Sequence, residues 1–213
     1  MRLDHVSYAV DPGGFSSTVQ RLGSALGASF SDGGVHPRFG TRNFVLPLAG
    51  GTYIEVVTTL DHPAADRAPF AQAVKHRAGA GGGWLGWVVS VTDIESVASR
   101  IGRDAIDGHR VRPDGFDLRW KQVGVLDLIK DPQLPFFIQW MIDAGERPAA
   151  NSSGVGRSRI SCLEIAGDPA TVSAWLGEPD AHPLDEVEVQ WVDGDPGVTA
   201  VIFATTNGSV RID

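Results

Sequence analysis

One order of secondary-structure elements recurs three times along this chain of 213 residues, and this repeat limits the possible folds more than any other feature. In each pass the hydrophobic pattern predicts a strand, an amphipathic helix and then further strands. The first pass has strands over 3–10, 41–48 and 52–58, with the helix after Asp11-Pro12 and a turn-rich stretch over 33–40. Its last two strands are predicted to form a hairpin.

The second and third passes repeat this order. In the second pass a strand over 84–91 precedes a helix capped by Asp93, because aspartate accepts hydrogen bonds from the free N–H groups of a first turn. In the third pass Asp168-Pro169 opens the helix, and Asn207-Gly208 suits a hairpin turn. The remaining predicted strands cover 105–111, 117–125, 134–141, 160–166, 186–192, 198–205 and 209–212.

The repeat predicts an α+β protein made of βαβββ modules. We assign residues 1–78 to a first module and 79–145 to a second, which together form one domain, with the glycine-rich run 77–83 as a flexible connection. Residues 146–156 are a Pro/Ala/Asn/Ser/Gly-rich linker, and 157–213 form a third, smaller βαβββ-like module. That module either packs on the other two or pairs with its copy in a homodimer.

Charge and composition exclude several kinds of partner. The net charge of -8 and the sequence pI of about 5.1 argue against nucleic acid and anionic membranes, which need a basic face. No apolar run is long enough to span a membrane, and the single cysteine, Cys162, has no partner for an internal disulfide. We therefore expect a cytoplasmic protein whose partner is a small molecule.

Two short motifs carry a resemblance to a known family. They are Leu-Asp-His-Val in the first strand (3–6) and Tyr-Ile-Glu-Val in the last strand of the first module (53–56). Further matches are His36-Pro37, Gly40-Thr41, Asn43, Pro47-Leu48, Arg112-Pro113-Asp114-Gly115 and Trp120. Over residues 1–143 the chain thus resembles glyoxalase-like domain proteins of the vicinal oxygen chelate (glyoxalase/bleomycin resistance/dioxygenase) superfamily. The resemblance implies that two modules curve eight strands into an open cup.

The resemblance also implies a metal site between the first and last strands of both modules. His5 and Glu55 would be ligands from the first module, and imidazole and carboxylate suit Zn, Fe, Mn, Ni or Co. In the second module Gly86 or Trp87 matches His5, and Gln139 matches Glu55. Glycine has no side-chain ligand and an amide oxygen is a weak one, so the cofactor is either one divalent metal on His5, Glu55 and Gln139 or none.

His5 and Glu55 are also the candidate catalytic residues. Histidine transfers protons near neutral pH, and Glu55 could remove a proton beside a substrate carbonyl, which is lyase or isomerase chemistry. The alternatives are a buried, hydrogen-bonded His5 and a Glu55 paired structurally with Arg38 or Arg42. In either case Glu55 lies in an apolar strand and needs a specific partner, because burying an unpaired carboxylate is costly.

The predicted substrate-binding residues come from a loop and from the second module. They are His36, Arg38, Asn43, Trp120, Gln139 and Trp140, in which the cationic and polar groups would hold a polar substrate and the indoles a planar one. Three functions remain open: a metal-assisted small-molecule enzyme, a non-catalytic protein that sequesters a ligand without metal, and an assembly or regulatory module with a filled cup.

Overall fold

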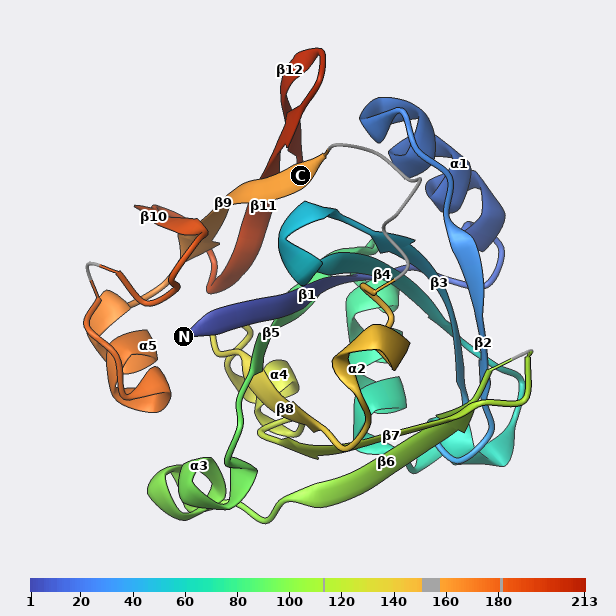
Figure 1. Ribbon diagram of the computed structural model, residues 1–213, viewed down its shortest axis with the longest axis horizontal. Helices are drawn as coiled ribbons and strands as arrows, with labels where there is room; N and C mark the ends of the chain where they lie inside the picture. Colours follow the sequence, from blue (N-terminus) through green and yellow to red (C-terminus); the bar gives the residue numbers. More distant parts are fainter. Residues whose placement is uncertain (113, 151–157, 181) are drawn as a thin grey trace.

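The chain forms two mixed sheets. The computed structural model describes residues 1–112, 114–150, 158–180 and 182–213. Eight strands follow the order β2-β3-β4-β1-β5-β8-β7-β6, and this sheet curves strongly around its own concave face (Figure 1). A second sheet, of order β10-β9-β11-β12, lies outside the curve, beside β1 and β5.

The eight-stranded sheet is built from two units with the same order of elements. The first contains β1 (Arg2–Ala9), α1 (Phe15–Leu26), β2 (Ser31–His36), β3 (Thr41–Pro47) and β4 (Tyr53–Thr59). The second contains β5 (Gly83–Ser90), α3 (Ile94–Ile101), β6 (Ile106–Val111), β7 (Asp117–Val123) and β8 (Phe136–Trp140). In each unit the last strand runs parallel to the first, and β1 joins the two units by antiparallel pairing with β5. The predicted fold class is confirmed.

Two irregularities interrupt the pairing of β1 with β5. The register passes from Leu3–Val89 directly to His5–Val88, which leaves Asp4 as an extra residue on β1. It also passes from Ser7–Gly86 to Tyr8–Trp84, which leaves Leu85 as an extra residue on β5. Because such bulges redirect side chains, they change which residues face the inside of the curve.

The third unit has the predicted order of elements but a different strand order. It contains β9 (Arg159–Ala166), α5 (Pro169–Leu176), β10 (Glu188–Val192), β11 (Gly197–Thr205) and β12 (Gly208–Ile212). Its first strand, β9, lies between β10 and β11, and its last strand is at an edge. This unit therefore forms a separate small sheet instead of a third part of the cup. The division of the chain at residues 146–156 stays a prediction.

The main hydrophobic core fills the space between the two sheets. Trp87 and Phe137 come from the large sheet and Leu163 and Phe203 from the small one, and all four are fully buried. Trp84 joins them across the gap, because its indole Nε1 donates to the Ile212 carbonyl at 2.9 Å. The two sheets thus share one continuous core.

Several local predictions hold. Asp93 caps α3 by accepting from the Ser96 N–H, and Asp168 caps α5 by accepting from the N–H groups of Ala170 and Thr171. The hairpin between β11 and β12 is present as expected, but its turn is one residue earlier than predicted: Thr206 and Asn207 form the turn, and Gly208, at a φ of 114°, begins β12 opposite Thr205.

Other local predictions were wrong. Part of the turn-rich stretch 33–40 belongs to β2, whose glycines mask a strand pattern. The run 77–83 is not a free connection, because residues 77–79 end helix α2 (Pro69–Gly79) and Gly83 begins β5. A short helix α4 (Asp127–Lys130) follows β7. Most of the predicted linker lies outside the described residues, but Ala149 is buried against Val45 and Tyr53.

Among the described residues, no helix has the length and apolar character needed to cross a bilayer.

Candidate functional site

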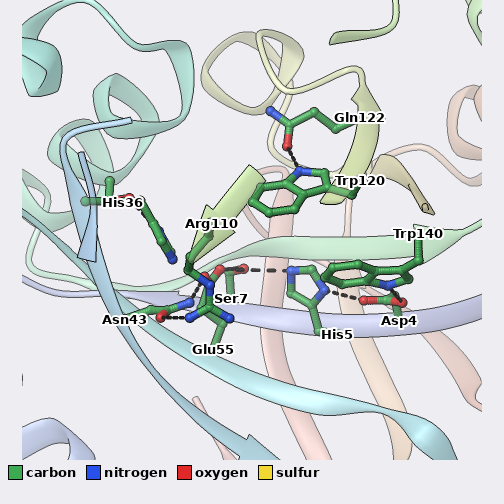
Figure 2. A network of polar contacts seen from close by, with 11 residues as sticks. Asp4, His5, Ser7, His36, Asn43, Glu55, Arg110, Trp120, Gln122 and Trp140 are labelled. Atoms are coloured by element: carbon green, nitrogen blue, oxygen red, sulfur yellow. Dashed lines mark hydrogen bonds and ion pairs between the residues drawn. The ribbon is translucent and has the colours of Figure 1, made fainter. Parts of the chain in front are cut away.

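A cavity of about 70 Å³ lies on the concave face of the large sheet. Both units contribute to its wall, which contains a polar side and an aromatic side. The polar side chains are His5, His36, Asn43, Glu55 and Arg110, and the aromatic ones include Tyr53, Phe70, Phe136, Trp120 and Trp140. Figure 2 shows the polar groups converging from different strands of the sheet.

The bulge in β1 places Asp4 beside His5. Asp4 Oδ1 lies 2.8 Å from His5 Nδ1, and Asp4 Oδ2 accepts from the indole Nε1 of Trp140 at 2.9 Å. An ionised carboxylate only accepts hydrogen bonds, so in the neutral ring Nδ1 carries the proton and Nε2 has the free lone pair. The ring also stacks on Tyr53, with centroids 4.4 Å apart. Asp4 and Tyr53 therefore fix both the tautomer and the orientation of His5.

Glu55 is held by two neutral donors. Ser7 Oγ donates to Oε2 at 2.8 Å, and Asn43 Nδ2 donates to Oε1 at 2.6 Å. Ser7 pairs directly with Glu55 across β1 and β4, and Asn43 comes from β3. Oε2 also lies 3.9 Å from His5 Nε2. The expected partners of Glu55, Arg38 and Arg42, lie elsewhere: Arg38 is exposed and Arg42 pairs with Asp32.

Burial sets the protonation of two cavity residues. Burial, helped by Arg110 and opposed by Glu55, lowers the pKa of His36 from 6.5 to about 4, so this imidazole is neutral at physiological pH. Burial and the nearby carboxylates of Asp4 and Glu55 raise the pKa of Tyr53 well above its usual value. The phenol consequently keeps its proton, and neither ring changes charge near neutral pH.

The aromatic side of the cavity is continuous. The Trp120 ring lies 5.8 Å from that of Trp140 and 6.1 Å from that of Phe39, centroid to centroid. Trp120 rests on Gly108, where a Cβ would come within 2.3 Å of the indole. These faces suit a planar or apolar part of a ligand.

The structure brings together most of the predicted site residues. His5, His36, Asn43, Glu55, Trp120 and Trp140 all line the cavity, and their roles in binding or catalysis stay predictions. Arg38 does not line it. Gln139 lies on the other face of β8, where its Oε1 accepts from the Ile94 N–H at the start of α3 at 3.0 Å. The prediction that Gln139 is the equivalent of Glu55 in the second unit was therefore wrong by one residue.

Sequence reasoning missed Asp4, Ser7 and Arg110. Asp4 reaches the site only because of the bulge, and Ser7 had a signal in its i+2 spacing from His5, since alternate residues of a strand share a face. Arg110 likewise alternates with the buried Gly108 in β6, between exposed neighbours. That alternation could have identified it as an inward-facing residue.

The residues present do not fit the metal site implied by the family resemblance. In each unit the first strand pairs in parallel with the last. His5 lies opposite Tyr53 in the first unit and Val88 lies opposite Phe136 in the second, so Val88 holds the position of His5. Ile138 likewise holds the position of Glu55, and neither side chain offers a ligand. Within the described ranges no three His, Cys, Asp or Glu side chains are grouped to hold an ion. Only two protein ligands would remain, beside a buried arginine.

Two βαβββ units form one curved sheet around a concave site, which is the architecture that the sequence resemblance implies. The sequence profile of the glyoxalase-like domain matches residues 3–179. The chain therefore belongs to the glyoxalase-like domain family. No curated protein matches its sequence.

Several solved structures are similar to this chain at low sequence identity, and the first of them shows the same fold over the whole chain. A hypothetical protein from Staphylococcus aureus is 17% identical, with a TM-score of 0.73 over 100% of this chain and 98% of that one. A methylmalonyl-CoA epimerase from Mycobacterium tuberculosis is 17% identical, with a TM-score of 0.45 over 65% of this chain and 86% of that one. One from Streptomyces coelicolor, in complex with 2-nitronate-propionyl-CoA, is 16% identical, with a TM-score of 0.43 over 66% and 96%. Family and cavity together support a function in binding or converting a small molecule.

Gly33 offers a direct test of the polar side of the site. A Cβ at this position would lie 2.0 Å from Asn43 Oδ1 and 3.1 Å from Arg110 Nη1. We expect Gly33→Ala to displace Asn43 from Glu55 and to lower the free energy of unfolding by about 1–3 kcal/mol, as for other overpacked sites. Chemical denaturation measures this change. Gly79→Ala is the matched control, because its Cβ would meet nothing within 4 Å; equal stability of the two variants would contradict the packing described here.

Proposed function

We infer that this protein catalyses proton transfer on a small oxygenated substrate, as an isomerase or a lyase. The observation that carries the proposal is the pair of His5 Nε2 and Glu55 Oε2, 3.9 Å apart in the cavity wall, with each side chain oriented by its own partners. Oriented proton carriers inside a cavity are what general acid–base catalysis needs.

The chemistry follows from the roles of the two groups. His5 Nε2 takes a proton from the carbon beside a carbonyl, and the electron pair of that C–H bond moves toward the carbonyl oxygen, giving an enolate. Asp4 stabilises the imidazolium that forms, because it accepts the Nδ1 proton at 2.8 Å. Return of a proton to a neighbouring atom, by His5 or through Glu55, completes an isomerisation. Departure of a group from the next carbon completes a lyase reaction.

Hydrogen exchange in D₂O tests this proposal before a natural substrate is known. Small carbonyl compounds with a planar part, such as phenylpyruvate and acetophenone, are incubated with the protein, and loss of the C–H signal is followed by NMR. We expect the wild type to accelerate exchange, and His5→Gln and Glu55→Gln to lose about 10²–10⁴-fold of that rate, as is usual when a general base is removed.

His109→Gln is the matched control, because His109 is an exposed histidine on the same sheet, outside the cavity. Its exchange rate should equal that of the wild type. Folded His5→Gln and Glu55→Gln proteins that exchange as fast as the wild type would contradict the proposal.

A second candidate, supported by the continuous aromatic wall, is a protein that binds a planar molecule without converting it. Tight binding of the same compounds with no exchange by the wild type would favour this function.

A further inference from the structure

Arg110 is a buried cation without a close anionic partner. Its side chain is 7% exposed and lines the cavity. Among the described residues its hydrogen-bond partner is Asn43 Oδ1, at the long distance of 3.4 Å, and no carboxylate lies within 4.0 Å of it. Burial lowers its pKa, although Tyr53 and Glu55 oppose this effect. A guanidinium has five N–H donors and is costly to bury unpaired, so most of its binding capacity is unused.

His36 presents a second unused group in the same place. It is 8% exposed, and its Nε2 is buried without a hydrogen-bond partner among the described residues. Its other nitrogen, Nδ1, lies 3.1 Å from Thr41 Oγ1. When the Thr41 hydroxyl donates to Nδ1, Nε2 carries the ring proton, and Figure 2 shows the ring directed toward Arg110.

The surrounding backbone preserves the space that the guanidinium occupies. Gly33 and Gly34 of β2 face Arg110, and a Cβ on Gly33 would come within 3.1 Å of its Nη1. Arg110 belongs to β6, whereas His36 belongs to β2. The two donors therefore come from opposite ends of the large sheet, and both line the same cavity.

The proposed chemistry creates a need for these donors. Removing a proton beside a carbonyl puts negative charge on the substrate oxygen, in a cavity whose wall already contains the Glu55 carboxylate, with the Asp4 carboxylate next to it on His5. In metal-dependent relatives an ion would take up that charge, but the side chains here do not provide a site for one. Arg110 is the one Lys or Arg side chain in the described wall of this cavity.

We propose that Arg110 and His36 form an oxyanion site, which binds the enolate oxygen of a planar, conjugated carbonyl substrate whose flat part lies against Trp120 and Trp140. This inference rests on the proton-transfer function proposed above and specifies its substrate class. A neutral imidazole suits the role, because it donates a hydrogen bond without giving up a full proton, as in other enolising enzymes. The low pKa of His36, about 4, keeps the ring in that state.

Binding of 4-nitrophenol tests the oxyanion site without requiring turnover. Its phenolate is a planar oxyanion with a visible absorption band, and 4-nitroanisole is a neutral ligand of similar shape. We expect the wild type to bind the phenolate more tightly than either protonated 4-nitrophenol or 4-nitroanisole. This preference lowers the apparent pKa of 4-nitrophenol when it is bound. Arg110→Met should weaken phenolate binding about 10–100-fold, the usual range for a charged hydrogen bond, and leave binding of 4-nitroanisole nearly unchanged.

Further variants keep the test specific. Arg110→Lys retains the charge and should recover part of the binding, and His36→Gln should cause a smaller loss than Arg110→Met. Arg42→Met is the matched control, because Arg42 pairs with Asp32 and does not line the cavity. Circular dichroism checks that each variant is folded.

The outcomes separate this site from the proton-transfer function. His5→Gln should lose the exchange of substrate hydrogen in D₂O but should still bind the phenolate. A wild type that binds the phenolate without accelerating exchange would overturn only the proposed reaction. Equal affinity of the wild type for phenolate and 4-nitroanisole, no phenolate binding, or full phenolate binding by folded Arg110→Met would overturn the oxyanion site.

Discussion

Replacing Trp84 by alanine is expected to lower the free energy of unfolding by about 3–5 kcal/mol, the range for a buried tryptophan. Trp84 is 4% exposed and links the two sheets, through its hydrogen bond to the Ile212 carbonyl and its packing against Phe203, with centroids 6.4 Å apart. The change removes the packing and leaves the carbonyl without this donor. Urea denaturation followed by far-UV circular dichroism measures the loss.

The same experiment tests whether the small sheet folds independently. A shared core predicts one cooperative transition for the wild type, with coincident circular dichroism and tryptophan fluorescence. Trp191→Ala is the control, because Trp191 is only partly buried, on the small sheet, and should cost less. Two separate transitions in the wild type, or a Trp84→Ala loss no greater than that of Trp191→Ala, would show that the sheets are energetically independent.

Acidification is expected to destabilise the wild-type protein through His36. The pKa of His36 is lowered from 6.5 to about 4 in the folded state, so between these values the unfolded chain binds a proton that the folded protein does not. The free energy of unfolding is therefore unaffected by His36 well above pH 6.5 and decreases as the pH falls from 6.5 toward 4. The full decrease, reached below both pKa values, is about 3 kcal/mol.

Denaturation curves at a series of pH values check this prediction. His36→Gln should remove that part of the pH dependence, whatever its effect on stability at neutral pH. His76→Gln is the control, because His76 is exposed on α2. A pH dependence of His36→Gln that equals that of the wild type would mean that His36 does not carry the effect.

Local pattern was sufficient to predict most of the fold. Alternation located the strands, and Asp93 and Asp168 marked two helix starts correctly because a capping side chain acts on its own first turn. Helix α2 was missed because its alanine-rich sequence carries only a weak apolar stripe. The order of the strands in the third unit also escaped prediction, since it depends on which strands meet after folding.

The site was only partly predictable for the same reason. The motifs that contain His5 and Glu55 could be recognised within single strands. The side chain of Asp4 lies on the same side as that of His5 because of a bulge against β5. The position of Gln139 depends on the register of β8 with β5, so neither feature could be derived from one strand alone. Arg110 enters the cavity because the sheet curves until β6 lies near β2.

The curvature of the large sheet gives a bound ligand a mechanical role. Strands β2 and β6 are the two ends of the strand order and come into contact, yet the described residues form no backbone ladder between them (Figure 1). An oxyanion bound by His36 of β2 and by Arg110 of β6 would connect the two edge strands, in place of the missing ladder. Ligand binding would then slow amide hydrogen exchange at both edge strands together, even though the two strands are about seventy residues apart in the chain.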